Sequence, residues 1–539
     1  MKTIYTIIFL CFTSFLFSQQ ELSNYWITFK DKKDTPYSIF APQAYLSPRA
    51  IVRRQRFHIP IDSLDLPIAP MYLNEVRAAG VNLRHVSKWL NAATGVTTDS
   101  IAQLIAKLPF VIGVKRVGVY HQPTPRLINT RAQPPQAYQA TNYYYGYGTS
   151  QIRMVKGHAL HRLGYSGEEV YIGVQDGGFL NVDVNPFFDS LRINDRIIAT
   201  RDFVDGDTYV YESARHGSSV LSVMASNLPY LFVGTSPEAS YLCLKTEDVR
   251  SESLTEECNW VAAIEYADSI GVDIVNSSLG YTTFSEESMN YDYLSLNGQQ
   301  SKASQAADIA FNKGIFVVNS AGNSGDKSWR FIGTPADSRE IFSIGAITSE
   351  RFRARFSSFG PTADGRIKPN IAAPGARVVV AGKGNYEVGL SSGTSLSAPL
   401  IAGLVATLKE AFPNKDNRAI RLAIEQSAHQ ASTPDNVLGY GIPDFYKAYQ
   451  LLKGKKEQTA DFIDVYASKD ALEIVFLKRV AEKSLLRIYD WSENLLLEQE
   501  VLPKQQFEQL KWEYNLPTGV YYLELFKQGQ VRRTFFMRK

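Results

Sequence analysis

Three residues of types that work together in nucleophilic acyl transfer occur in the middle of the chain: Asp176, His216 and Ser395. Asp176 ends a short apolar run, whereas His216 and Ser395 each begin a stretch of small and apolar residues typical of a helix. A serine hydroxyl becomes an effective nucleophile when an imidazole takes its proton, and a buried carboxylate holds that imidazole in one tautomer. A serine at a helix N-terminus also lies among backbone N–H groups that can stabilise an oxyanion. Alone, each residue could be a turn, a surface histidine or a helix cap, but together they form a candidate catalytic triad.

The chain around these residues alternates short apolar runs with helical patterns from residue 151 to residue 452. The apolar runs lie at residues 169–174, 240–244, 272–275, 314–318 and 341–344, and helical patterns between them lie at 256–270 and 302–312. Such alternation is typical of a parallel sheet with helices on both faces. We therefore predict an α/β domain with a doubly wound, mostly parallel sheet.

Two smaller blocks flank this domain. Residues 19–121 contain expected strands at 25–29, 82–89 and 111–119 and expected helices at 47–55, 73–79 and 99–107, which favours a small ferredoxin-like α+β module. Residues 122–150 are rich in Pro, Gln and Tyr and indicate an exposed linker. Residues 460–539 change to period two, with strands expected at 461–466, 472–476, 485–489 and 520–526, which predicts a small antiparallel β-sandwich.

The composition is that of an ordinary globular protein. Of 539 residues, 45% are hydrophobic and 21% charged, which excludes a disordered, a collagen-like or a polytopic membrane protein, and the net charge of +3 gives no electrostatic case for nucleic acid. Lys2, the apolar residues 4–17 and the small Ser18 are typical of a signal peptide over residues 1–18, so we expect a secreted or cell-surface protein. For Cys243 and Cys258, a disulfide and two separate buried thiols both stay open.

The stretch G-T-S-L-S-A-P at residues 393–399 resembles the serine motif of the subtilisin-like serine peptidases, the subtilases. The H-G-S stretch at His216, the D-G-G stretch at Asp176 and the order Asp, His, Ser also resemble that family. The resemblance covers residues 145–452 and implies a subtilisin-like fold and a secreted serine endopeptidase that hydrolyses protein or peptide substrates through an acyl-enzyme. It further implies that Asn323, in the stretch N-S-A-G-N-S-G, donates its side-chain amide to the oxyanion.

The resemblance also implies which residues border the substrate. Ser278, Leu279 and Gly280 are similar to the segment whose backbone pairs with the substrate as an added strand. Ala321 and Gly322 would border the pocket for the side chain before the scissile bond. An ordinary turn at the end of a strand is the alternative interpretation of residues 278–280.

No cofactor is expected, because the chain contains no CxxC or HExxH metal motif. Calcium sites are frequent in subtilases, and Asp202, Asp205 and Asp207 form an acidic loop, which we interpret as solvated while a calcium site stays open. Two positions depart from the family pattern: Gly177 replaces the usual Ser or Thr, and Leu396 replaces the common Met. Because of Gly177, a catalytically silent binding or surface protein on a subtilase scaffold is the alternative function.

The flanking blocks have resemblances of their own. Residues 87–91 and 108–111 look like prodomain segments of secreted bacterial subtilases, which implies that residues 19–121 assist folding and inhibit the enzyme until the linker is cut. A permanent accessory domain is the alternative. The C-terminal block, with L-R-I-Y-D at 486–490, L-P-T-G-V-Y-Y-L at 516–523 and a basic end, resembles the sorting domains of the type IX secretion system of Bacteroidetes, whose machinery would then be a partner. A carbohydrate- or protein-binding sandwich is the alternative there.

Overall fold

The structure is a computed structural model that describes residues 21–123, 143–212, 214–454, 463–467, 472–476, 484–490, 494–502, 508–512, 517, 519–527 and 530–538. The chain divides into two compact units, residues 1–453 and residues 454–539. The expected signal peptide and residues 124–142 of the expected linker lie outside the described residues.

Seven parallel strands form the central sheet of the first unit, in the order β13-β12-β11-β10-β5-β9-β6. The strands are β5 (Tyr171–Asp176), β6 (Ile197–Asp202), β9 (Ser240–Lys245), β10 (Ile274–Ser277), β11 (Phe316–Ser320), β12 (Phe342–Ile347) and β13 (Ile371–Pro374). Five of them overlap the predicted apolar runs, whereas β6 and β13 were not predicted. The parallel α/β architecture is thus confirmed.

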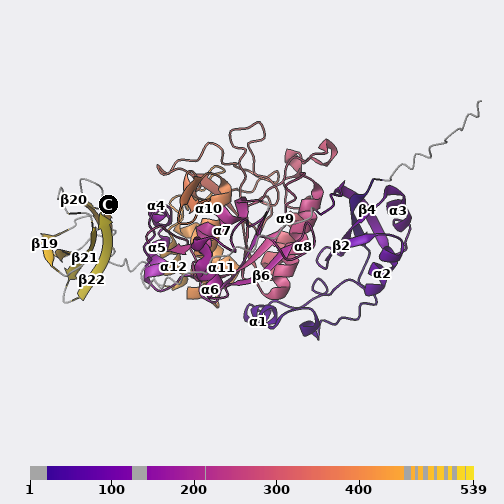
Figure 1. The fold of residues 1–539 in the computed structure, drawn as a ribbon, viewed down its shortest axis with the longest axis horizontal. Helices are drawn as coiled ribbons and strands as arrows, with labels where there is room; N and C mark the ends of the chain where they lie inside the picture. The colour runs from indigo at the N-terminus through magenta and orange to yellow at the C-terminus, as the bar shows by residue number, and fades with distance from the viewer. Residues whose placement is uncertain are drawn as a thin grey trace, which may run out of the picture. The chain divides into compact units, whose positions relative to one another are not determined.

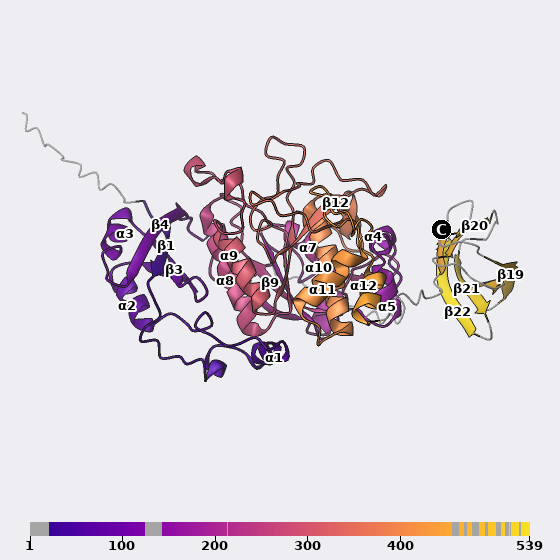
Figure 2. The same ribbon diagram turned by 180° about the vertical axis from the view of Figure 1, so that it is seen from behind.

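Two layers of helices cover this sheet, because its strands are apolar on both faces. On β9, Tyr241 and Cys243 belong to one hydrophobic core, and Leu242 and Leu244 belong to the other. The first core contains α7 (His216–Ala225) and α10 (Thr394–Ala411), which pack against each other. The second contains α8 (Leu254–Ile270) and α9 (Lys302–Asn312), which lie side by side in Figures 1 and 2. Cys243 and Cys258 are buried free thiols, so the disulfide alternative is excluded in this structure.

The polarity of the sheet decides where the candidate residues gather. Strand β5 ends at Asp176, and the loops after β10 and β11 contain residues 278–280 and 321–323, so all three groups lie at the carboxyl edge of adjacent strands. Open α/β sheets bind their ligands at this edge. Helices α7 and α10 begin at His216 and Thr394, and their N-termini bring His216 and Ser395 into the same part of the molecule.

Residues 23–119 form a separate four-stranded antiparallel sheet in the order β2-β3-β1-β4. Its elements are β1 (Ser23–Phe29), α1 (Pro48–Arg56), α2 (Pro70–Ala78), β2 (Asn82–Ser87), β3 (Ala92–Thr97), α3 (Asp99–Ile105) and β4 (Val111–Val119). Every predicted element is present, but β3 was missed. Its sequence A-A-T-G-V-T contains two Ala and one Gly, which are depleted in strands, and shows no alternation, since all six residues are buried.

The second unit contains two antiparallel sheets, in the orders β16-β17-β20 and β19-β18-β21-β22. Its strands are β16 (Ile463–Ala467), β17 (Leu472–Phe476), β18 (Ser484–Asp490), β19 (Leu495–Val501), β20 (Glu508–Trp512), β21 (Gly519–Lys527) and β22 (Gln530–Arg538). On β18, Ser484, Leu486 and Ile488 are buried and alternate with less buried residues, as the period-two pattern predicts.

The remaining elements of the first unit are α4 (Thr149–Met154), α5 (Gly157–Arg162), α6 (Asp189–Ile193), α11 (Asn417–Ser427), α12 (Phe445–Leu452), β7 (Asn227–Leu228), β8 (Phe232–Val233), β14 (Val378–Ala381), β15 (Val388–Ser391) and four short 3-10 turns. Helix α4 begins inside the expected linker, which therefore ends earlier than predicted. Among the described helices, none has the length and apolar character needed to cross a membrane.

Candidate active site

Asp176 and His216 form a hydrogen-bonded pair at the carboxyl end of β5. His216 Nδ1 lies 2.9 Å from both carboxylate oxygens of Asp176, whose side chain is 1% exposed. The backbone N–H of Gly177 donates to Asp176 Oδ1 at 2.8 Å. A main-chain donor thus holds the carboxylate, although Gly177 lacks the hydroxyl that a Ser or Thr would offer there. This arrangement fixes the imidazole with Nδ1 facing the acid.

The charge of Asp176 raises the pKa of His216 above its usual 6.5, although burial opposes this effect. The Glu247 carboxylate adds to the rise. The side chain of His216 is 46% exposed, which leaves its other face open to an incoming molecule. His216 is therefore a base that stays hydrogen-bonded to a buried acid and can still be reached from outside.

Ser395 is the second residue of α10, and its backbone is held in an unusual way. Pro399, inside the helix, has no N–H to donate to the carbonyl of Ser395 four residues earlier. Ser278 Oγ donates to that carbonyl instead, at 2.8 Å, and in turn accepts from Asn276 Nδ2 at 3.1 Å. The loop after β10 thus fixes the first turn of α10 around the candidate nucleophile.

Two donors converge on the space beside Ser395. A methyl group built on Gly393 would lie 3.5 Å from Asn323 Nδ2, 3.6 Å from Ser395 N and 3.7 Å from Ser395 Oγ. The orientation of Asn323 is set by Thr394, whose backbone N–H and hydroxyl donate to Asn323 Oδ1 at 2.9 and 3.0 Å. Because the amide oxygen is occupied, the amide nitrogen faces the space next to the hydroxyl. Such a pair of donors is suited to receive an oxyanion.

One expected contact is not formed. Within residues 143–212 and 214–454, His216 bonds to Asp176, but no hydrogen bond joins its ring to Ser395 Oγ. Catalytic hydrogen bonds in proteins without substrate are often long and tighten when the reacting complex forms. The serine–histidine contact stays a prediction.

The predicted substrate-binding residues differ in exposure. Gly280 is exposed, Leu279 is half-buried, and a side chain on Gly280 would meet only Thr334 O, at 3.6 Å. Gly322 is half-buried and donates its N–H to Thr394 Oγ1 at 3.1 Å. In contrast, Ala321 is completely buried. Its methyl group therefore lies beneath the wall of the site, and residues 279, 280 and 322 provide the reachable surface.

The acidic group at residues 202–212 contains Glu212 in place of the expected Asp207. Asp202 and Asp205 group with Glu212, with oxygens within 4.8 Å of one another, and Asp207 is not in this group. Lys245 Nζ lies 2.8 Å from Asp202 and 3.6 Å from Asp205. Since one ammonium group already pairs with two of the three carboxylates, the donor set fits a salt-bridged loop better than a calcium site.

Two residues next to the site, Thr394 and Glu247, were not predicted from the sequence. Thr394 orients Asn323, and its place directly before Ser395 in the serine motif was the available clue. Glu247 follows β9 at the same sheet edge as Asp176 and accepts from the hydroxyls of Tyr281 at 2.8 Å and Thr246 at 3.0 Å. Burial raises the pKa of Glu247 above its usual 4.5, and repulsion by Glu252 and Asp176 adds to this.

Known proteins share this arrangement of segments. A profile of the subtilase family (peptidase S8) matches residues 167–441, just over half of the chain, and the peptidase S8 propeptide domain of Bacteroidota matches residues 24–133. Subtilisin NAT of Bacillus subtilis subsp. natto is 28% identical over 345 residues, which are 63% of this chain and 76% of that protein. The thermostable alkaline protease of Halalkalibacterium halodurans is 30% identical over 257 residues, 47% of this chain and 63% of that protein.

Among solved structures, the crystal structure of MycP1 with its N-terminal propeptide removed matches with a TM-score of 0.44 and 22% identity, over 56% of this chain and 96% of that one. The match of the family profile to more than half of the residues decides the assignment. The chain belongs to the subtilase family and is a subtilisin-like serine peptidase with an N-terminal prodomain.

Proposed function

We propose that this peptidase is a secreted endopeptidase that cuts peptide bonds through Asp176, His216 and Ser395. His216 takes the proton of Ser395 as the hydroxyl attacks the carbonyl carbon, and Asp176 stabilises the imidazolium that forms. His216 then gives the proton to the leaving amine, an acyl-enzyme remains, and water releases it by the same steps in reverse order. The Asp176–His216 bonds of 2.9 Å support these roles.

The observation that carries the proposal is the convergence of Asn323 Nδ2, Ser395 N and Ser395 Oγ on one small space. Two fixed donors beside a hydroxyl are of little use to a protein that only binds. They are what a tetrahedral intermediate needs, because its oxyanion forms within bonding distance of the attacking oxygen. The backbone N–H of Ser395, in the first turn of α10, supports the same role.

Labelling of the processed protein with a fluorophosphonate tests the proposal. We expect covalent labelling on Ser395 and its loss in Ser395→Ala, together with a drop in peptide hydrolysis of ~10⁴-fold or more. Absence of labelling in correctly processed protein, or near-normal hydrolysis by Ser395→Ala, would instead favour a silent binding protein. Mass spectrometry of a peptide library cut by the active protein then gives its cleavage preference.

We further propose that residues 19–121 form a ferredoxin-like prodomain that inhibits the peptidase and that cleavage in the linker ends this inhibition. The order β2-β3-β1-β4 with two helical connections supports this topology. Residues 121–122 contact the loop between β9 and α8, where His121 Nε2 lies 3.1 Å from Ser251 Oγ and Arg250 donates to Gln122 O at 2.8 Å. The prodomain chain therefore leaves β4 beside residues that follow Glu247, at the carboxyl edge of the sheet.

The C-terminal unit is proposed to be a β-sandwich that acts as a sorting domain for type IX secretion. Its two antiparallel sheets support the sandwich, and the motifs at residues 486–490 and 516–523 support the sorting role. Expression of a reporter fused to residues 460–539 in a Bacteroidetes strain with and without this secretion system tests it. Export that is independent of the system would favour a binding sandwich.

A further inference from the structure

Two loops flank the candidate triad at the carboxyl edge of the sheet. One begins at Thr246, directly after β9, and the other contains residues 278–281, directly after β10. Strand β5, which ends at Asp176, lies between β9 and β10, so the two loops start about 10 Å apart. The space above Asp176 therefore depends on how these loops are held relative to each other.

A hydrogen bond between two side chains joins the loops across the end of β5. Tyr281 OH donates to Glu247 Oε1 at 2.8 Å, and Thr246 Oγ1 donates to the same oxygen at 3.0 Å. Tyr281 is 2% exposed, and burial and the charge of Glu247 raise the pKa of its hydroxyl well above 10. Tyr281 is thus always a donor in this bond, which we call the clasp.

The Glu247 end of the clasp is fixed next to the triad. The backbone N–H of Thr246 donates to Asp176 O at 2.9 Å. A methyl group built on Gly177 would lie 3.6 Å from Glu247 Cβ, and the charge of Glu247 acts on the ring of His216. The clasp therefore has one end at the floor of the candidate active site.

The Tyr281 end lies directly after the segment that is expected to pair with substrate. Tyr281 N donates to Thr334 O at 2.7 Å, and Thr334 N donates to Tyr281 O at 3.1 Å, so the backbone is fixed on the side of β11. The hydroxyl fixes the same residue on the side of β9. Gly280 is exposed, and a methyl group built on it would meet only Thr334 O, at 3.6 Å. The position of Gly280 therefore depends on how its neighbour Tyr281 is held.

We propose that Glu247 and Tyr281 are positioning residues for extended peptide substrates. Their bond holds residues 279–280 where a peptide can pair with them as an added strand. Neither side chain takes part in the bond-making steps at Ser395. This role rests on the proposed function, because it concerns peptides that are cut at Ser395.

The physical reason is that a segment already held in its bound position costs a peptide less to bind than a segment that samples several positions. If only a fraction of the molecules has the segment in place, the apparent dissociation constant rises by the inverse of that fraction. One hydrogen bond can change such a population by a factor of about 5 to 10. Loss of the clasp should thus raise KM for substrates that reach residues 279–280 and leave the chemical steps unchanged.

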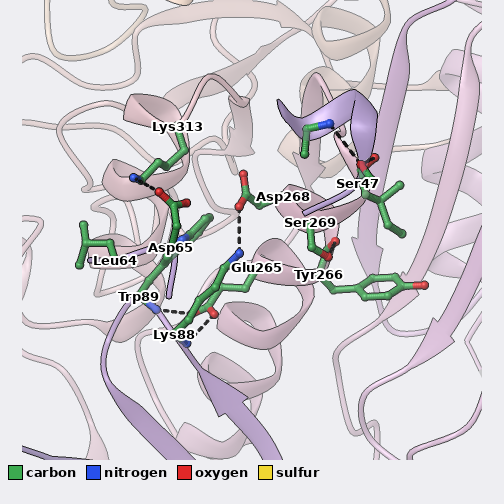
Figure 3. A network of polar contacts seen from close by, with 12 residues as sticks. Ser47, Leu64, Asp65, Lys88, Trp89, Glu265, Tyr266, Asp268, Ser269 and Lys313 are labelled. Atoms are coloured by element: carbon green, nitrogen blue, oxygen red, sulfur yellow. Dashed lines mark hydrogen bonds and ion pairs between the residues drawn. The ribbon is translucent and has the colours of Figure 1, made fainter. Parts of the chain in front are cut away.

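The clasp is separate from the polar network through which the prodomain contacts α8. That network lies near the C-terminal end of α8, where Arg54 and Lys88 bind Asp268 at 2.9 and 3.1 Å and Lys88 N donates to Glu265 at 2.7 Å (Figure 3). The clasp lies in the loops after β9 and β10 instead. Variants of the clasp therefore leave these prodomain contacts unchanged, and the processed variants can be compared with the processed parent.

Steady-state hydrolysis by the processed protein tests the clasp with two substrates, a peptide with several residues before the scissile bond and an ester of a single blocked amino acid. Tyr281→Phe removes only the hydroxyl. We expect it to raise KM for the peptide ~5- to 10-fold with kcat within ~2-fold, and to leave both constants for the ester within ~2-fold of the parent. Tyr291→Phe is the matched control, because Tyr291 OH donates to Glu257 Oε1, also at 2.8 Å, and it should leave KM for the peptide within ~2-fold.

Variants of Glu247 test the other end of the clasp. Glu247→Gln keeps an oxygen that can accept from Tyr281, so KM for the peptide should stay within ~2-fold of the parent. Glu247→Ala removes this acceptor and should raise KM as Tyr281→Phe does. Because both substitutions break the same bond, the double variant should have a KM within ~2-fold of either single variant.

An unchanged KM for the peptide in Tyr281→Phe, equal losses on the peptide and the ester, or effects of the two substitutions that multiply would overturn the proposal. If Tyr281→Phe does not fold, Glu247→Ala is compared with Glu247→Gln in its place. Labelling of Ser395 by the fluorophosphonate is measured first on the parent. Absence of labelling contradicts the proposed function and with it the clasp, whereas a labelled and active parent whose variants keep its KM contradicts the clasp alone.

Discussion

At the scale of single residues, the side chain of Asn323 is already oriented to donate to an oxyanion before any substrate is bound. Thr394 occupies its amide oxygen, and its amide nitrogen faces the space beside the Ser395 hydroxyl. A donor that acts on an oxyanion contributes to the transition state and little to the bound substrate. We therefore expect Asn323→Ala to lower kcat by ~10²- to 10³-fold with KM changed only a few-fold.

The measurement is steady-state hydrolysis of a peptide by the processed enzyme. Thr394→Ser is the matched control, because it keeps the hydroxyl that orients Asn323 and should retain activity within a few-fold. A large rise in KM for Asn323→Ala with an unchanged kcat would show that Asn323 binds substrate and does not stabilise the oxyanion.

The pKa of His216 leads to a prediction for the pH profile. His216 must be neutral to accept the serine proton, and the Asp176 charge raises its pKa above 6.5. Activity is thus present above the raised pKa and is lost as the pH falls through it. We expect the acidic limb of kcat/KM, measured on a neutral peptide between pH 5 and 9, to have its midpoint above 6.5. A midpoint below that value contradicts the coupling of His216 to Asp176.

At the scale of elements, Pro399 and Ser278 both determine how the backbone carbonyl of Ser395 is hydrogen-bonded. Pro399 deprives the Ser395 carbonyl of its helical donor, and Ser278 Oγ replaces that donor at 2.8 Å. Ser278→Ala should leave a buried carbonyl unsatisfied and lower the free energy of unfolding by ~1–3 kcal/mol. Pro399→Ala supplies an N–H to the same carbonyl, so the double variant should be more stable than Ser278→Ala alone.

Urea unfolding of all four proteins, in the Ser395→Ala background to prevent self-digestion, measures this coupling. We expect an interaction free energy of ~1 kcal/mol between the two positions. If the two effects add within ~0.3 kcal/mol, the carbonyl finds another donor and the explanation for Ser278 is wrong.

Features that depend on short stretches of sequence, such as the ends of strands and the starts of helices, could be predicted from the sequence. Asp176, His216, Ser395 and Asn323 occur where strands end or helices begin, so their patterns indicated both fold and site. Strand β3 was missed because all six of its residues are buried and give no period-two pattern, and Gly95 packs so tightly that a methyl group there would lie 2.4 Å from Val81. The contact between Arg54 and Asp268 was missed for another reason: they are 214 residues apart, and only the folded backbone brings them together.

For the whole molecule, the division into residues 1–453 and 454–539 separates the candidate chemistry from the C-terminal sheets. Asp176, His216, Asn323 and Ser395 all belong to the first unit, and so do the two helical layers that position them. A domain with its own core can fold by itself, and its activity then depends on its own contacts. Removal of residues 454–539 should thus leave kcat/KM on a short peptide within ~2-fold of the full chain and leave the unfolding midpoint of the first unit unchanged.

The two proteins are compared after processing, by peptide hydrolysis and by thermal unfolding followed by circular dichroism. The matched control removes residues 445–539 and so also deletes α12, whose Phe445 is fully buried in the core that contains α10. That truncation should lower the unfolding midpoint, because the loss of buried aromatic and aliphatic side chains costs several kcal/mol. A loss of more than ~10-fold in kcat/KM after removal of only residues 454–539 would mean that the C-terminal unit acts on the peptidase itself, since the short peptide needs no further surface to bind.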